Sequence, residues 1–328
     1  MNTVLDNIKF RINRYLRRRN PLVLCYHGIH NNEVEFPIWT HLDYKTFEQH
    51  LKFIADNCNV ISLSALSEQL VGGNFDPYAV AITFDDGYHN NFTNAFPLLA
   101  KYKIPATIFV TTDFIGTSNF IWSDNLAAML TVTKRKSIAI DNAVHLPLTS
   151  PQGKANAYRL IANDLKKYTF DQICERLYII MNQLGVSEDS LREPVLQSCF
   201  GHLSWEQILE MQNSGLIEIA SHGMSHSILT RCTETVARKE IEKSKELLDS
   251  KLLHCPPFSS LISSFAYPNG GPTDYSQDTR KMLIAAGYNL VFTNIQSRVS
   301  KISDRYQMPR LCIGNECDLV AFKSLLCH

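Results

Sequence analysis

The fold of this chain is decided by residues 78–87, which read Tyr-Ala-Val-Ala-Ile-Thr-Phe-Asp-Asp-Gly. A short apolar run with β-branched residues indicates a buried strand, and this one ends in two carboxylates and a glycine. Residues 216–226 repeat the arrangement, since Leu-Ile-Glu-Ile-Ala is followed by Ser-His-Gly-Met-Ser-His. Because ligands gather at the C-terminal ends of strands in parallel α/β folds, we expect the carboxylates and the histidines to meet in space.

Strand-like and helix-like stretches alternate along most of the chain. We expect strands at residues 22–26, 78–82, 106–110, 216–220, 264–267, 290–293 and 308–313. Helical spacing appears at residues 44–57, 64–71, 91–102, 205–213, 234–253, 278–286 and 319–326. Ser64 and Ser67 are the candidate caps of the second of these helices. This alternation predicts a parallel α/β architecture, most simply a (β/α) barrel of seven to eight strands within residues 21–328.

Residues of about 117–203 interrupt the alternation. They are more polar, contain the basic runs 134–136 and 166–167, and carry helical pieces such as residues 172–184. We interpret this segment as a helical cap inserted on the catalytic face rather than as an independent domain.

The composition excludes several classes of protein. The 32 basic and 32 acidic residues give a net charge of zero, so nothing favours a nucleic-acid partner. No run reaches the ~18 apolar residues of a membrane span, and residues 1–20 have no continuous apolar core of a signal peptide. The nine cysteines are scattered without a Cys-x-x-Cys pair, which indicates reduced thiols. We therefore expect a cytoplasmic protein.

Residues 1–20 form a basic amphipathic pattern. Val4, Ile8, Ile12 and Leu16 recur every four residues among several arginines. Such a helix can cover one end of a sheet or barrel with its arginines in solvent. It can equally lie on an anionic surface, so peripheral contact with the inner face of the membrane stays open.

The two strand ends carry the residue types of a hydrolytic metal site. One carboxylate and two imidazoles are N/O ligands suited to Zn²⁺, Co²⁺, Ni²⁺ or Mn²⁺, and three protein ligands leave positions open for water and substrate. The second carboxylate can act as the general base on water bound by the metal. The carboxylates of Asp85 and Asp86 can both face the site because the chain turns at Gly87. If a helix begins near His222, its spacing from His226 puts both imidazoles on one face.

These motifs resemble those of the polysaccharide deacetylase family, also known as the nodulation-deacetylase homology domain or carbohydrate esterase family four. Residues 83–87 match its first motif, residues 221–226 its second, and residues 265–270, Phe-Ala-Tyr-Pro-Asn-Gly, its third. The resemblance spans residues of about 20–315 and is weakest in the cap. It implies a distorted (β/α) barrel and a metal-dependent N-deacetylase acting on amino sugars.

The resemblance also implies roles for individual residues. Asp86, His222 and His226 would bind the metal, most often zinc, and Asp85 would be the base. The third motif, Tyr267, Pro268, Asn269 and Gly270, would line the sugar site, with a backbone N–H at Asn269 stabilising the oxyanion.

The sequence departs from the family pattern in two places. Ala266 stands where the family has an arginine that orients the base, and Arg310 is the candidate substitute. The late Leu-x-His motif that supplies the general acid is absent, since the only late histidine is His328. His27 is the candidate acid, because residues 24–28 resemble the N-terminal motif of a branch that includes the biofilm poly-N-acetylglucosamine deacetylases.

The expected substrate is an N-acetylated sugar, more specifically a nucleotide- or lipid-linked glycan precursor. Two alternatives stay open. A cyclic imide or ureide hydrolase can use the same scaffold, and loss of the arginine at 266 and of the late histidine would also fit a catalytically decayed glycan-binding module.

Overall fold

A parallel sheet forms the centre of the protein. The computed structural model describes residues 15, 18–31, 35–140, 144–252 and 263–326. In spatial order the strands are β11 (Leu290–Phe292), β10 (Ser264–Ala266), β9 (Ile217–Ser221), β6 (Ala106–Val110), β5 (Ala79–Phe84), β1 (Leu22–Tyr26) and β12 (Leu311–Cys312), and β4 (Asn59–Val60) also pairs with β5. Every pairing in this sheet is parallel.

The sheet curls into a distorted barrel. Its two edges are linked by one segment, because Met308 bonds to β11 while β12 pairs with β1. The fold class predicted from the sequence is therefore confirmed. Side chains alternate along the strands, so that one buried cluster fills the inside and another lies under the surrounding helices. Val23, Ala81 and Phe109 belong to the inner cluster.

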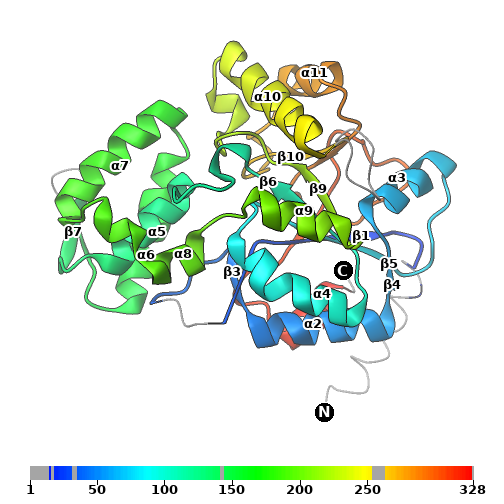
Figure 1. Ribbon diagram of the computed structural model, residues 1–328, viewed down its shortest axis with the longest axis horizontal. Coiled ribbons are helices and arrows are strands. Elements are labelled where there is room, and N and C mark those ends of the chain that lie inside the picture. The colour runs from blue at the N-terminus through cyan, green and yellow to red at the C-terminus, as the bar shows by residue number, and fades with distance from the viewer. Residues whose placement is uncertain (1–14, 16–17, 32–34, 141–143, 253–262, 327–328) are drawn as a thin grey trace.

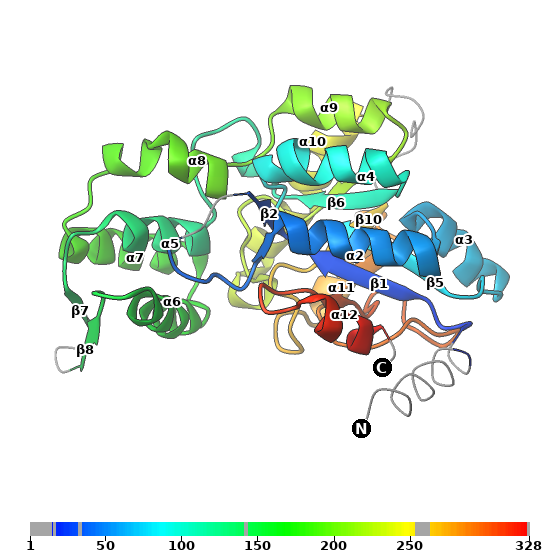
Figure 2. The same ribbon diagram turned by 90° about the horizontal axis from the view of Figure 1, so that it is seen from below.

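Helices cover the outside of the sheet (Figures 1 and 2). They are α2 (Tyr44–Asn57), α3 (Leu63–Gly72), α4 (Phe96–Tyr102), α9 (Trp205–Asn213), α10 (Glu234–Leu252), α11 (Gln277–Ala285) and α12 (Leu319–Leu325). Helix α2 shows why: Asp43 caps its first turn, and Phe47, Leu51 and Ile54 recur at helical spacing and are buried.

Three details differ from the sequence expectations. Ser62, not Ser64 or Ser67, caps α3, because its side chain accepts a hydrogen bond from the N–H of Ala65. The helix expected at residues 91–102 begins with a π-helical turn at Asn91–Ala95. The expected C-terminal strand is short, since only residues 311–312 pair with β1.

The interrupting segment forms a lobe beside the barrel (Figure 1). It contains α5 (Trp122–Val132), α6 (Pro151–Leu165), α7 (Phe170–Leu184), α8 (Pro194–Phe200) and an antiparallel hairpin of β7 (Ser137–Ile140) and β8 (Val144–Pro147). The lobe has its own apolar cluster, which also takes in Phe36 and Ile38. Polar contacts join it to the barrel side: Tyr88 donates to Asp124 at 2.8 Å, and Asn90 donates to the carbonyl of Cys199 at 3.2 Å.

The amphipathic helix expected at residues 1–20 lies almost wholly outside the described residues. Among the residues that the structure does describe, no helix is both long and apolar enough to span a membrane.

Candidate metal centre and active site

The ends of β5 and β9 bring the two motifs together. Asp85 and Asp86 follow β5 directly, and the chain then turns, with positive φ of 74° at Asp86 and 78° at Gly87. His222 follows β9, whose neighbour β6 pairs with β5. The parallel sheet thus places both strand ends at one edge, as the sequence predicted.

Asp86, His222 and His226 form a compact donor cluster. The Nε2 atoms of His222 and His226 lie 3.4 and 3.3 Å from Oδ1 of Asp86, and all three side chains are buried. Within the described part of the chain, this buried Oδ1 accepts no well-formed hydrogen bond. Buried polar atoms are rarely left without partners, so an oxygen and two ring nitrogens within 4.8 Å of one another fit a divalent cation.

The two histidines lie on a loop and not on a helix. The helix considered from the sequence is wrong, because Gly223 and His226 have φ of 82° and 61°. Glu240 on α10 holds this loop: its carboxylate accepts from the N–H groups of Met224 and Ser225 at 2.7 and 3.0 Å and from the Ser225 hydroxyl. A buried carboxylate therefore replaces the helical hydrogen bonds that the loop lacks.

A backbone carbonyl fixes the orientation of the His222 ring. Its Nδ1 lies 2.8 Å from the carbonyl oxygen of Ala266. A carbonyl can only accept, so Nδ1 carries the proton and Nε2 presents a lone pair toward Asp86. Burial alone would lower the pKa of His222, but the charges of Asp85 and Asp86 outweigh it and raise that pKa. A cation between these groups would displace the proton.

Asp85 is held by Arg310. The guanidinium donates from Nη1 to Oδ1 and from Nη2 to Oδ2, both at 2.7 Å, and both side chains are almost completely buried. The other donors reach the carbonyl of Thr293 and the side chains of Thr83 and Asn294. All five guanidinium hydrogens are thus used, which satisfies the buried charge. Burial would raise the pKa of Asp85, but Arg310 and His222 prevail and lower it, so Asp85 is ionised.

Arg310 comes from the segment that closes the barrel. It stands between Met308, which bonds to β11, and β12. Its guanidinium lies over the rings of Phe109 and Phe292, in the same inner cluster as Ala266. Asp85 is thus paired with an arginine from the residue just before β12, while position 266 in β10 is an alanine.

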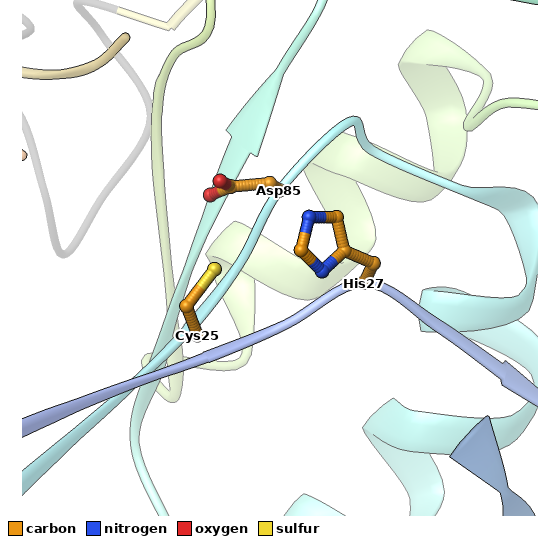
Figure 3. Close-up of side chains that lie close together, drawn as sticks. All are labelled: Cys25, His27 and Asp85. Atoms are coloured by element: carbon orange, nitrogen blue, oxygen red, sulfur yellow. The ribbon is translucent and has the colours of Figure 1, made fainter. Parts of the chain in front are cut away.

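His27 lies across from the Asp85 carboxylate. Figure 3 shows Cys25 of β1 and His27, the residue that follows β1, both pointing toward Asp85, which follows β5. One atom from each of the three lies within 4.8 Å of the others. Burial lowers the pKa of His27, and the charges of Asp86 and Asp85 offset part of that effect. Arg310 already binds both carboxylate oxygens of Asp85. A cation therefore fits the cluster of Asp86, His222 and His226 better than the cluster of Cys25, His27 and Asp85.

Of the four residues of the third motif, only Asn269 lines the cleft among the residues that the structure describes. Tyr267 is buried and stacks on Tyr275 with ring centroids 4.9 Å apart, so its side chain packs away from the carboxylates. Gly270 donates to the Pro268 carbonyl at 2.8 Å, and this tight turn sets Asn269 at φ 60°. Asn269 lines the same cleft as Asp86, His222 and His226.

Sequence reasoning missed Glu240, Asn294 and Cys25. Asn294 links two parts of the site, since it accepts from Arg310 at 2.8 Å and donates to the Asn269 carbonyl at 2.7 Å. A signal existed for Glu240, which falls among the buried positions Ala237, Ile241 and Ser244 of α10. Cys25 could have been found from its spacing of two residues from His27 on a strand.

A cleft of about 750 Å³ opens over these groups. Its lining includes His27, Asp85 and the three donors of the metal cluster, together with residues of α6 from the lobe. Three donors that fit a divalent cation thus lie beside an ionised carboxylate held by an arginine and beside a histidine. They share a cleft at the C-terminal edge of a parallel barrel. This combination is typical of metal-dependent hydrolases.

Comparison with known proteins agrees with this class. The family model for polysaccharide deacetylase matches residues 72–291, and the chain belongs to that family. His27 and Arg310 lie outside the matched range. The expected family is therefore confirmed, and with it the expected class of enzyme.

Individual relatives support the assignment. The poly-β-1,6-N-acetyl-D-glucosamine N-deacetylase of Staphylococcus epidermidis is 38% identical over 295 residues, which are 88% of this chain and 70% of that protein. YxkH of Bacillus subtilis is 32% identical over 110 residues, 33% of this chain and only 37%, less than two thirds, of that protein. The deacetylase PplD of Streptococcus pyogenes has the same fold, with a TM-score of 0.61, 17% identity and coverage of 94% of this chain and 98% of that one.

Proposed function

We propose that this enzyme removes the acetyl group from the nitrogen of an amino sugar in a glycan. The observation that carries the proposal is the arrangement of Asp86, His222 and His226 around one point, with the neighbouring Asp85 and His27 beside them. Hydrolysis of an acetamide needs a polarised carbonyl, a base for water and an acid for the leaving nitrogen, and this constellation offers a group for each task.

The steps are assigned as follows. Asp86, His222 and His226 would hold a divalent ion, which would supply Lewis acidity for the acetamide carbonyl and lower the pKa of the attacking water. Asp85 accepts the proton of that water, which forms a bond to the carbonyl carbon. We assign the backbone N–H at Asn269 to stabilise the developing oxyanion. His27 donates a proton to the nitrogen as the C–N bond breaks, leaving acetate and a free amine.

We also propose the identity of the metal, the branch of the family and the role of Arg310. We propose zinc as the metal, with cobalt, nickel or manganese as substitutes, because one carboxylate and two imidazoles suit these ions. We place the chain in the branch with an N-terminal Tyr-His-Gly motif. Support comes from His27, which follows β1 and points toward Asp85, so that both groups can reach one substrate. Arg310 takes the orienting role, supported by its paired hydrogen bonds to Asp85.

The substrate is an N-acetylated polysaccharide such as poly-N-acetylglucosamine, or a lipid- or nucleotide-linked precursor of one. The name of the Staphylococcus epidermidis relative supports the first. For the precursor we propose action in the cytoplasm, with residues 1–20 contacting the inner membrane face. Support comes from their basic amphipathic sequence. Co-sedimentation with anionic liposomes tests this contact, and equal sedimentation of a chain lacking residues 1–20 would contradict it.

Acetate release tests the reaction. Metal-stripped and metal-reloaded protein are compared on free, nucleotide-linked and lipid-linked N-acetylated sugars and on a polymer, beside Asp85→Asn and His27→Ala. We expect release only with metal, and loss of at least ~100-fold in both variants. Activity on cyclic ureides with none on any acetylated sugar would decide for the alternative hydrolase. Metal-independent glycan binding without turnover, unchanged in Asp85→Asn, would decide for a binding module.

A further inference from the structure

Two free cysteines face each other across the strands that close the barrel. Cys25 of β1 and Cys312 of β12 are register partners, and neighbouring parallel strands lie about 4.8 Å apart. Register partners of a parallel pair point to the same face of the sheet, here the inner face that Val23 also occupies. A separation of about 4.8 Å falls within the range of Cα distances that a disulfide can span.

Cys312 is the accessible member of this thiol pair. It is half-buried and lines the catalytic cleft, whereas Cys25 is completely buried. A small oxidant that enters the cleft therefore meets Cys312 first, with the thiol of Cys25 next to it.

The surroundings favour the thiolate of Cys312. A hydrogen bond with Cys25 lowers the pKa of Cys312, burial opposes this effect, and the positive charge of Arg310 adds to it. Burial raises the pKa of Cys25, so its thiol keeps its proton. Burial likewise raises the pKa of Cys174 and of Cys317. The thiolate is the reactive form of cysteine, and an accessible thiol of low pKa beside a second thiol is the usual arrangement of a redox-sensitive pair.

We infer that Cys312 and Cys25 form a reversible disulfide when hydrogen peroxide enters the cleft. The Cys312 thiolate attacks one peroxide oxygen, so that an S–O bond forms while the O–O bond breaks and hydroxide leaves. The sulfur is thereby oxidised to a sulfenic acid and the peroxide is reduced. The Cys25 sulfur then attacks the Cys312 sulfur. As the S–S bond forms, the S–O bond breaks, and the proton of Cys25 leaves with the hydroxyl group as water.

The disulfide would connect the two segments that position the proposed catalytic groups. Cys25 lies two residues before His27, and Cys312 lies two residues after Arg310. Arg310 in turn holds the carboxylate of Asp85. A disulfide brings its sulfurs to about 2.05 Å, closer than two thiols that share a hydrogen bond. On the basis of the proposed function, oxidation should therefore displace these groups and slow acetate release.

Mass spectrometry tests the disulfide apart from turnover. Zinc-loaded wild-type protein is treated with hydrogen peroxide, alkylated without reduction and digested. We expect a pair of peptides linked through Cys25 and Cys312, lighter than the two free peptides together by two hydrogen atoms. Dithiothreitol should separate them. Acetate release should fall at least ~10-fold on oxidation and recover with the same reductant.

Single variants separate the roles of the two thiols. Cys25→Ser removes the second thiol, so oxidation should stop at a sulfenic acid on Cys312, which dimedone labels. Cys312→Ser should leave Cys25 unlabelled, because that thiol is buried and protonated. Cys174→Ser, at an exposed cysteine of α7, is the matched control and should retain both the disulfide and the loss of rate.

The absence of a linked peptide would overturn the inference, as would equal labelling of the remaining cysteine in Cys25→Ser and Cys312→Ser. A disulfide that leaves acetate release unchanged would overturn its effect on turnover. A disulfide in protein that releases no acetate before or after reduction would instead uphold the thiol chemistry and refute the proposed reaction.

Discussion

Arg310 and Asp85 form paired hydrogen bonds of 2.7 Å in the interior of the barrel, although they are 225 residues apart in the sequence. The pair ties the segment that closes the barrel to the end of β5. It fixes the orientation of the Asp85 carboxylate beside Asp86, His222 and His226. Oδ2 of Asp85 lies 4.0 Å from Nε2 of His222. Orientation and stability of the site therefore depend on the same contact.

Substitution of Arg310 should affect both properties. Arg310→Met leaves Asp85 as an uncompensated buried charge, and we expect a loss of about 3–5 kcal/mol in the free energy of unfolding, measured in urea. Arg310→Lys keeps the charge but not the paired geometry, so the rate of acetate release should fall at least ~10-fold with a smaller loss of stability. The double variant with Asp85→Asn should recover part of the stability of Arg310→Met. No recovery would show that the two residues act independently.

Glu240→Gln should weaken the metal site without removing a ligand. In the wild-type protein the N–H groups of Met224 and Ser225 donate to the Glu240 carboxylate. The side-chain amide of a glutamine would place its own N–H donors against them. The loop that carries His222 and His226 would therefore lose hydrogen bonds that hold it. We expect metal affinity to fall about 10- to 100-fold, measured by competition with a chelating dye at fixed pH. Glu246→Gln, on the exposed side of the same helix, is the control. Unchanged affinity in Glu240→Gln would show that the loop needs no such support.

Metal removal should lower stability through the Asp86 cluster. At a free zinc concentration of 100 times Kd, binding to the folded state alone contributes about 2.7 kcal/mol. The melting temperature of wild-type protein should therefore rise with zinc concentration. Asp86→Asn should abolish this rise, whereas Asp278→Asn, exposed on α11, should retain it. A zinc-dependent rise of wild-type size in Asp86→Asn would place the ion elsewhere.

Stability should decrease in mild acid because of buried histidines. Burial lowers the pKa of His50, which stacks on Phe322 at 3.8 Å between centroids, to about 4. In the unfolded chain the pKa of the His50 imidazole is about 6.5, so the unfolded state binds the proton more readily. The contribution of neutral His50 to stability is therefore fully present above pH 6.5 and is lost as the pH falls toward 4.

Urea unfolding at several pH values between 7.5 and 4 measures this loss. Burial likewise lowers the pKa of His41 and of His202 to about 4, so they also contribute to the slope. His50→Gln should reduce it by up to about 1.4 kcal/mol per pH unit. An unaltered slope would mean that His50 is not among the titrating groups.

Most of the barrel could be predicted from local patterns. The apolar run before Asp85 and the one before His222 became β5 and β9, and the helix expected at residues 44–57 is α2 with those same limits. These features depend on the periodicity of neighbouring residues, which the chain carries locally. The wrong expectation of a helix at His222 arose because a spacing of four residues also fits a loop that turns at Gly223.

The sequence by itself determined the parallel barrel, the two motifs at strand ends and the family to which the chain belongs. Only the tertiary structure decided that Arg310 pairs with Asp85, that Glu240 supports the histidine loop and that Trp39 rests on Gly314. The physical reason is that these contacts join residues far apart in the chain. A local pattern records which face of an element is buried, but the partner that meets it is fixed only when the sheet curls and the lobe packs beside it.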